Sequence, residues 1–381
     1  MLDLNQVKII DNHCHPYLKE KEAKDFRSYW STSLLEGAAL NNMNTMTYKM
    51  MLKSLKSILD LHASADEETV VARRNDLYND DPDSYTSMLL NEAGLELLMA
   101  DIGFPSVGFA GYSIRFDEFA GSMPLPIKPI IRVDNVMLDL INPDLSFKEF
   151  LDVFDHTLEK EISTQNPVAL KTVIAYLVSL EVKKCTLREI EDSYRKFQAD
   201  PSDMFEAAPL FFHAVYTAVE KCSKHNLPLQ IHTGFGNAPF LNVVKSNPAL
   251  LFHFLNDPEV HNVKVVLLHS GYPYVRETAY LVNNYPNLWV DISQVTQYTS
   301  VGLDSLLTDL LAMAPVNKIL YGSDGLGIPE LFWWPAIQIR RCLSNILNTF
   351  VEQDLVDEHS ALEIGKGILR DNALDLYEGL V

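Results

Sequence analysis

The stretch VKVVLLHSGYPYVRETAYLVNNYPNLWVDIS, residues 263–293, contains two apolar runs separated by an amphipathic segment of helical length. Both runs are almost continuous in large apolar residues, which is typical of strands that are covered on both faces. Each run leads to a polar residue, His269 in the first and Asp291 in the second. A strand, a helix and another strand in this order predict one parallel βαβ unit.

The same pattern continues outward in both directions along the chain. Six further apolar runs occur, and amphipathic segments lie between most of them. Eight strands that alternate with helices predict an α/β fold, namely a closed parallel (β/α)8 TIM barrel. A chain of 381 residues is within the range of one such barrel with insertions. The six runs lead to or contain Asp11, Gly103, Arg132, Lys171, His232 and Asp324.

Two regions are too long for a minimal barrel. Residues 17–87 are helix-rich and carry charge clusters, so we expect a helical insertion after the first strand, over the barrel mouth. A second helical excursion is expected after the fourth strand, in LEVKKCTLREIEDSYRKFQADPSD, and the final helices in residues 332–381. We therefore expect residues 1–381 to form a single barrel domain with one large insertion.

Charge and cysteine content restrict the partners and the compartment. Asp+Glu is 51 and Lys+Arg is 31, so the formal net charge is −20, which argues against binding to nucleic acid or to a membrane surface. The four cysteines are scattered without a CxxC pair, and no apolar run is long enough to span a bilayer. We expect a cytoplasmic protein with a small-molecule substrate, and leave association into a homo-oligomer open.

The segment IIDNHCHPYL, residues 9–18, places two imidazoles around a thiol at the end of the first strand. Alternate side chains of a strand share a face, so His13 and His15 point the same way and Cys14 points the opposite way. Asp11 is in phase with the histidines and is expected to be a partner of them. The alternative is that both histidines are simply polar residues that end a strand.

Three further strand ends favour a metal site over that alternative. His232, His269 and Asp324 each follow an apolar strand, at the end where barrel enzymes have their active sites. An unpaired imidazole or carboxylate buried there would cost a few kcal/mol, and a shared divalent cation removes this cost. Imidazoles with a carboxylate suit zinc best, with manganese or iron as alternatives, and one or two ions are expected.

These residues resemble the pattern of the amidohydrolase superfamily of metal-dependent hydrolases along nearly the whole chain. That pattern has HxH on strand one, a lysine on strand four in many members, histidines on strands five and six, and an aspartate on strand eight. Within the superfamily the sequence is similar to the amidohydrolase-2 group and to the hydrolase domain of FluG-type proteins, through LKTVIAY, LPLQIHTGFG, LLHSGYPY and LYGSDG followed by PELFWW. The resemblance implies the metal ligands His13, His15, Lys171, His232, His269 and Asp324.

Lys171 lies inside an apolar strand, where a charged ammonium is unfavourable unless it is paired. The resemblance implies a carbamylated lysine that bridges two metal ions. An unmodified lysine that binds a substrate carboxylate and a lysine whose head reaches solvent are the alternatives.

Substrate contacts are expected from residues beside the ligands. Arg132 ends the third strand and is predicted either to hold a substrate anion or to pair with Asp134 or another carboxylate. Tyr176 and Tyr272 follow the strand-four lysine and the strand-six histidine and are predicted to touch the substrate. Similar proteins often have an arginine at the position of Leu177. A substrate contact made by that arginine is therefore not expected in this chain. The aromatic residues Tyr29, Trp30, Trp333 and Trp334 are assigned to the core, with a lid role as the alternative.

The function that follows is metal-dependent hydrolysis of an amide-like C–N bond. A metal-activated water would attack the carbonyl, and Asp324 would act as general base and then as general acid. A non-oxidative decarboxylase of the same superfamily, with one metal and a free Lys171, is the alternative. A barrel that binds metal without catalysis is a third hypothesis, which the complete ligand set disfavours.

Overall fold

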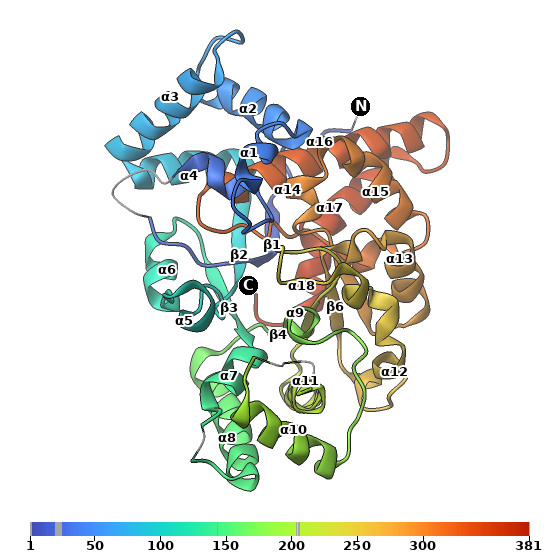
Figure 1. The fold of residues 1–381 in the computed structure, drawn as a ribbon. Coiled ribbons are helices and arrows are strands. Elements are labelled where there is room, and N and C mark those ends of the chain that lie inside the picture. Colours follow the sequence, from blue (N-terminus) through green and yellow to red (C-terminus); the bar gives the residue numbers. More distant parts are fainter. Residues whose placement is uncertain (1, 20–24, 143, 203, 205, 381) are drawn as a thin grey trace.

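The computed structural model describes residues 2–19, 25–142, 144–202, 204 and 206–380. Eight parallel strands form one sheet in the order β1 to β8, so each strand pairs with its neighbours in the chain (Figure 1). This confirms the predicted (β/α)8 barrel. The strands are β1 (Ile9–Cys14), β2 (Leu95–Asp101), β3 (Ile127–Arg132), β4 (Ala169–Thr172), β5 (Leu229–His232), β6 (Val265–Leu268), β7 (Leu288–Asp291) and β8 (Ile319–Leu320).

Backbone hydrogen bonds between β1 and the segment after β8 close the barrel. Asn12 N donates to Tyr321 O at 2.9 Å, and Asp324 N donates to His13 O at 2.8 Å. Between these two bonds the carboxylate of Asp11 accepts from the backbone N–H of Ser323 at 2.8 Å. A side-chain bond therefore adds to the backbone bonds that join β1 to the segment after β8.

Helices occupy the segments between the strands. The stretch 263–293 folds as expected, with α13 (Val275–Asn284) between β6 and β7, and α13 buries Val275, Ala279 and Val282 on one face. The other helices that follow β2 are α5 (Val107–Ala110), α6 (Phe116–Ser122), α7 (Val133–Leu140), α8 (Phe147–Gln165), α9 (Ile174–Leu177), α10 (Leu187–Ala199), α11 (Ala208–His225), α12 (Phe252–Leu255), α14 (Val295–Tyr298), α15 (Leu303–Leu311), α16 (Glu330–Glu352), α17 (Glu358–Lys366) and α18 (Asn372–Leu376). Short 3-10 turns are η2 (Val243–Ser246), η3 (Pro248–Leu251), η4 (Val260–Asn262), η5 (His269–Gly271), η6 (Ser300–Gly302) and η7 (Val316–Lys318), and η8 (Gly367–Asp371) is a π-helical turn.

A block of helices lies between β1 and β2, where the sequence predicts the insertion. It comprises η1 (Phe26–Trp30), α1 (Ala38–Asn42), α2 (Met46–Ile58), α3 (Glu67–Asp80) and α4 (Pro82–Ala93), and it forms the blue upper part of Figure 1. Helix α4 continues beyond residue 87 and ends at Gly94, which adopts a left-handed conformation with φ of 66°. Residues 20–24 of the predicted insertion lie outside the described residues, and its treatment as a separate unit of the domain stays a prediction.

A buried ion pair fixes this block to the helix that follows the barrel. The guanidinium of Arg74 donates from Nε to Glu330 Oε1 at 2.6 Å and from Nη2 to Oε2 at 3.1 Å. Tyr85 donates its hydroxyl to the same carboxylate at 2.8 Å, and both charged side chains are fully buried. Since Glu330 begins α16, directly after the segment that carries Asp324, the insertion has a fixed position beside the strand ends.

The core has two parts that position the site. Apolar residues between the strands and the helices form a large outer layer, which includes Cys14. A smaller cluster fills the barrel interior, where Tyr377 and Leu380 from the end of the described chain pack on Ile10 and Leu97 of the first strands. The barrel is thus closed at the amino-terminal ends of its strands, and the carboxyl ends remain for a site. None of the helices in the described part of the chain combines the length and apolarity that a membrane span needs.

Candidate active site

A cavity of about 520 Å³ opens at the carboxyl ends of the strands. Its wall is formed by strand-end residues, by the insertion and by the loops after β2, β3, β4, β5, β7 and β8. Among the residues singled out from the sequence, those that line it are His15, Tyr29, Arg132, Asp134, Lys171, Tyr176, Leu177, His232, His269 and Asp324. His13 is fully buried directly beside them.

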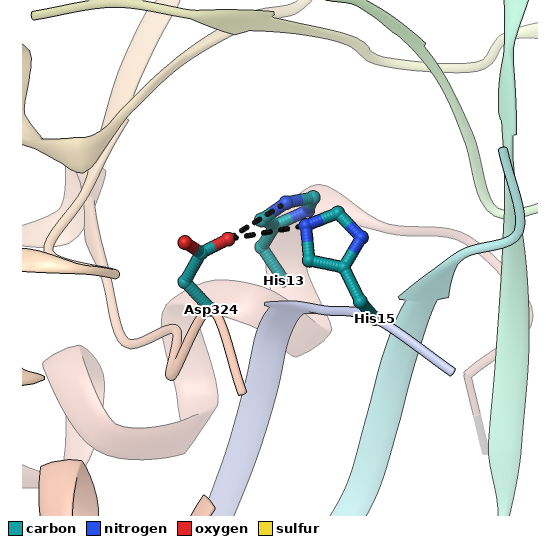
Figure 2. A group of neighbouring side chains, drawn as sticks. All are labelled: His13, His15 and Asp324. Atoms are coloured by element: carbon teal, nitrogen blue, oxygen red, sulfur yellow. Dashed lines mark ion pairs between the residues drawn. The ribbon is translucent and has the colours of Figure 1, made fainter. Parts of the chain in front are cut away.

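His13, His15 and Asp324 form a compact group in which one ligand atom of each lies within 4.8 Å of the others (Figure 2). Oδ1 of Asp324 is 3.4 Å from Nε2 of His13 and 3.3 Å from Nε2 of His15. Asp324 has a positive φ of 56°, which is uncommon for a residue other than glycine. Together with the hydrogen bond from Asp324 N to His13 O, this conformation holds the carboxylate against the two imidazoles.

The residues around the HxH pair depart from simple alternation. Cys14 points away from the site, because its Sγ donates to Met99 O at 3.4 Å within the outer core. The expectation that Asp11 is a partner of the imidazoles is wrong: its carboxylate accepts from the backbone N–H of His13 at 3.2 Å and of Ser323. The pairing register shifts between Asp11 and Cys14, so a strict two-residue period does not hold there. Asp11 therefore holds the ends of two strands together.

His232 and His269 form a second pair of rings on the opposite side of the barrel. Nε2 of His269 lies 3.0 Å from Nδ1 of His232, and Nδ1 of His269 lies 2.8 Å from the hydroxyl of Ser293. Asp291, at the end of β7, accepts from His269 N and from the Ser293 hydroxyl, both at 2.7 Å. The sequence places Asp291 at the end of an apolar run but predicts no role for it. Its position at a strand end was the available signal.

The donor set fits a divalent cation. Burial lowers the pKa of His13, His232 and His269 well below the ordinary value, and the charge of Lys171 adds to this effect. These rings are therefore neutral at pH 7 and have a lone pair to donate, as a metal ligand must. Neutral imidazoles beside one carboxylate are a typical set for zinc and related ions.

Lys171 is buried, with 2% of its side chain exposed, so the reading in which its head reaches solvent is wrong. Its Nζ lies 2.9 Å from Oδ2 of Asp101 and 2.7 Å from Nε2 of His13. Burial lowers the pKa of Lys171, and the charge of Asp101 opposes that shift. Lys171 is thus within reach of both the metal ligands and a carboxylate.

Asp101, at the end of β2, is the residue that the sequence analysis missed. Burial alone would raise its pKa, but the charges of Arg132 and Lys171 outweigh burial and hold the pKa well below its usual range. Arg132 donates from Nε to Oδ2 of Asp101 at 3.0 Å, so the pairing alternative for Arg132 is correct with Asp101 as the carboxylate. Asp134 instead accepts from the Thr172 hydroxyl and from Val173 N. The signal was again an aspartate that ends an apolar strand.

The two tyrosines have different positions. Tyr176 lines the cavity, with its ring centroid 4.6 Å from that of His232 and its hydroxyl accepting from Asn237 N at 3.0 Å. Tyr272 lines a separate, shallower depression with Arg276 and is 37% exposed. The positive φ values of His269, Ser270 and Gly271 turn the chain outward before Tyr272. The structure does not bring Tyr272 to the cavity, and its predicted role in substrate binding is not supported.

The insertion supplies one wall of the cavity, in agreement with its expected position over the barrel mouth. Tyr29 is partly buried against the core and also lines the cavity, so it is not a core residue alone, whereas Trp30, Trp333 and Trp334 are buried as expected. Leu34 N donates to Ala238 O at 2.9 Å, and Ala238 N donates to Thr32 O at 3.1 Å. This short parallel bridge joins the insertion to the loop after β5 across the cavity mouth.

A parallel barrel with neutral imidazoles and a carboxylate at its strand ends is typical of the metal-dependent barrel enzymes. The chain resembles one family of that class, because the family model described as amidohydrolase matches residues 192–379. It is also 27% identical over 405 aligned positions to the protein fluG of Emericella nidulans, covering 97% of this chain and 45% of that protein. The chain thus spans less than half the length of this curated relative. The matches confirm the resemblance to this family.

Solved structures show the same fold. A proposed metal-dependent hydrolase from Lactobacillus casei ATCC 334 superposes with a TM-score of 0.86 at 23% identity, over 99% of this chain and 97% of that one. The uronate isomerase of Thermotoga maritima gives a TM-score of 0.64 at 13% identity, over 98% and 95% of the two chains. The glucuronate isomerase of Caulobacter crescentus gives 0.64 at 14% identity, over 98% and 91%. At these identities the likeness establishes the fold and not the reaction.

Proposed function

We propose that this chain is a metal-dependent hydrolase that cleaves an amide-like C–N bond of a small molecule. The observation that carries the proposal is the position of Asp324, whose carboxylate lies within 3.4 Å of both imidazoles of the HxH pair on the wall of a cavity. A buried carboxylate beside two imidazoles, at the end of the barrel where substrates bind, is suited to proton transfer.

The residues that would hold the metal are those implied by the resemblance, with zinc as the preferred ion. The buried carboxylate of Asp324 and the rings of His13 and His15 form one side of the site, and His232 and His269 form the other. A divalent cation bound there would lower the pKa of a water molecule and polarise the scissile carbonyl. Whether one or two ions bind depends on the state of Lys171.

The protein's own groups divide the remaining work. Asp324 accepts the proton of the attacking water and returns it to the leaving amine. Arg132 is held in place by Asp101 and still faces the cavity, so its other N–H groups can orient an acyl group that carries a carboxylate. Tyr176 can place its ring against the substrate, since Asn237 fixes its hydroxyl.

One observation favours a second candidate, a metal-dependent non-oxidative decarboxylase. The ion pair between Lys171 and Asp101 stabilises an unmodified ammonium, and the decarboxylase alternative requires a free lysine with one metal. A carbamylated Lys171 with two metals favours hydrolysis instead.

A direct assay separates the two reactions. The zinc-loaded protein is incubated with a panel of N-acyl amides and with a panel of aromatic carboxylic acids, and release of amine and of carbon dioxide is measured. Amine release that disappears in Asp324→Asn supports the proposal. Release of carbon dioxide without amine identifies the decarboxylase. If neither product is released although the protein binds zinc tightly, the barrel binds metal without catalysis.

The remaining properties are proposed on the same basis. The formal net charge of −20 supports a small-molecule substrate and opposes nucleic acid and anionic membrane surfaces. A cytoplasmic location stays a prediction, and the choice between a monomer and a homo-oligomer stays open.

A further inference from the structure

A serine hydroxyl distinguishes the two ring nitrogens of His269. Nδ1 of His269 lies 2.8 Å from Oγ of Ser293, and this hydroxyl donates to Oδ1 of Asp291 at 2.7 Å. Oδ1 also accepts from the backbone N–H groups of His269 at 2.7 Å and of Ser293 at 3.2 Å, so it acts as an acceptor throughout. The single proton of the hydroxyl is therefore directed at Asp291, and Oγ can meet the ring only as an acceptor. The neutral ring of His269 thus carries its hydrogen on Nδ1 and a lone pair on Nε2.

A backbone carbonyl fixes His232 in the complementary state. Nε2 of His232 lies 3.1 Å from Phe235 O, which can only accept, so Nε2 carries the hydrogen and Nδ1 carries the lone pair. Nδ1 of His232 lies 3.0 Å from Nε2 of His269. Neither of these facing nitrogens has a hydrogen to donate to the other. Two buried lone pairs at this distance repel each other, and a bound cation would convert that repulsion into two ligand bonds.

The carboxylate behind Ser293 is held from its other side as well. Oδ2 of Asp291 accepts from Asn12 Nδ2 at 2.9 Å, and Asn12 Oδ1 accepts in turn from the hydroxyl of Tyr377 in the barrel interior. A Cβ added to Gly322 would lie 2.8 Å from Oδ2 of Asp291 and 2.8 Å from Cβ of Ser293, so the backbone after β8 packs directly on this pair. Asp291 and Ser293 are both fully buried. The hydrogen bond to the imidazole is thus one end of a chain of contacts that runs through the barrel.

We propose that Ser293, held by Asp291, is a positioning residue that keeps His269 in the tautomer able to bind the metal. Without the hydroxyl, the ring can carry its hydrogen on Nε2 and donate it to Nδ1 of His232, which removes both nitrogens as ligands. Hydrogen-bond partners of metal-binding histidines typically contribute about 10–100-fold to metal affinity. The inference rests on the metal site of the proposed function, but it holds for hydrolysis and for decarboxylation alike.

The tautomer can be measured directly in the metal-free protein. When histidine is isotope-labelled at both ring nitrogens, long-range proton–nitrogen correlation NMR spectra distinguish the nitrogen that carries hydrogen from the one that does not. The signal of His269 is identified by its absence from the spectrum of His269→Gln. We expect the hydrogen on Nδ1 in the wild type and on Nε2 in Ser293→Ala. This readout requires neither bound metal nor activity.

Zinc affinity supplies the second measurement. Dissociation constants are determined by competition with a chromophoric chelator, and Ser293→Ala should bind zinc about 10–100-fold more weakly than the wild type. The matched control is Ser270→Ala. Ser270 is fully buried next to His269 in the chain, and its hydroxyl donates to the backbone carbonyl of Asp291 at 2.9 Å, so its proton is directed at the backbone and not at a ring. Ser270→Ala should keep both the tautomer and the zinc affinity of the wild type.

A hydrogen on Nε2 of His269 in the metal-free wild type would overturn the inference, whether or not Ser293→Ala folds. So would an unchanged tautomer and zinc affinity in a folded Ser293→Ala, or an equal loss of affinity in Ser270→Ala, because such a loss would not depend on the ring contact. A protein that binds zinc but releases no amine fails the proposed hydrolysis and leaves these measurements intact, so the two hypotheses fail separately.

Discussion

Replacing Asp101 by asparagine tests the charge arrangement beneath the cavity. Oδ2 of Asp101 accepts from Arg132 Nε at 3.0 Å and lies 2.9 Å from Lys171 Nζ, and the Asp101 side chain is fully buried. Asn keeps the shape but removes the negative charge, so two buried cations lose their shared partner. Breaking a buried ion pair by removing one partner typically costs about 3–5 kcal/mol. We expect Asp101→Asn to lower the free energy of unfolding by about that amount.

The pH dependence of this deficit has a defined sign. Burial already lowers the pKa of Lys171, and Asp101 is the charge that opposes the shift, so its removal lowers the pKa of Lys171 further. The unfavourable free energy of keeping a charged Lys171 in the folded variant has its full value at pH values below the pKa of Lys171 in the folded state. It is lost as the pH rises through that pKa toward the unfolded value near 10.4. The deficit of the variant should therefore shrink as the pH rises above the pKa that Lys171 has in the folded variant.

The assay is urea denaturation in the presence of a chelator, so that metal binding does not contribute. Asp134→Asn is the matched control, because Asp134 is equally buried at the same mouth but accepts from Thr172 and Val173. It should cost about 1 kcal/mol, the net contribution of an ordinary hydrogen bond, with little change over the same pH range. If Asp101→Asn costs no more than Asp134→Asn, or if its deficit grows with pH, the reasoning is refuted.

Three further experiments test the candidate metal site. His13→Ala or His232→Ala should lower bound metal much more than Cys14→Ala, as elemental analysis can show, and equal loss from the cysteine variant would overturn the ligand assignment. If Lys171 is carbamylated, Lys171→Ala should lose metal and activity, and adding a small carboxylate or bicarbonate should restore part of both. Normal metal content together with weaker substrate binding would instead identify an ammonium that binds substrate. Asp324→Asn should retain most of the metal while single-turnover rates fall about 10²–10⁴-fold, and near-wild-type turnover would remove Asp324 from the chemistry.

The sequence predicted the barrel because its signal is repeated and local. Each strand is a short apolar run, and the helix between β6 and β7 follows from the period of its apolar residues. The positions of His232, His269 and Asp324 at strand ends follow from the same runs, because parallel strands of a barrel present their carboxyl ends at one mouth. The bounds of the insertion were less accurate, since α4 ends at a left-handed Gly94 that the charge pattern does not reveal.

What the sequence could not predict depends on contacts between distant segments or on single backbone angles. Asp11 was assigned to the imidazoles because strand alternation was assumed to continue, and a register shift breaks it. Asp101 was missed because an aspartate at a strand end can serve as a metal ligand, an ion-pair partner or a turn residue. Only its proximity to Arg132 and Lys171 in the folded protein shows that it is an ion-pair partner. Tyr272 was assigned to the cavity because it follows His269 in sequence, whereas positive φ values turn it outward.

The failure at Tyr272 has a physical origin that also bears on function. Three of the residues with positive φ, His269, Asp324 and Gln294, lie directly at the cavity. Such conformations are unfavourable for residues other than glycine, so local propensity predicts against them. They persist because bonds formed elsewhere fix them, such as the bond from Asp324 N to His13 O and the bond from His269 N to Asp291. The strand runs therefore identify which segments reach the mouth, while these fixed, strained angles help determine which side chains face the cavity.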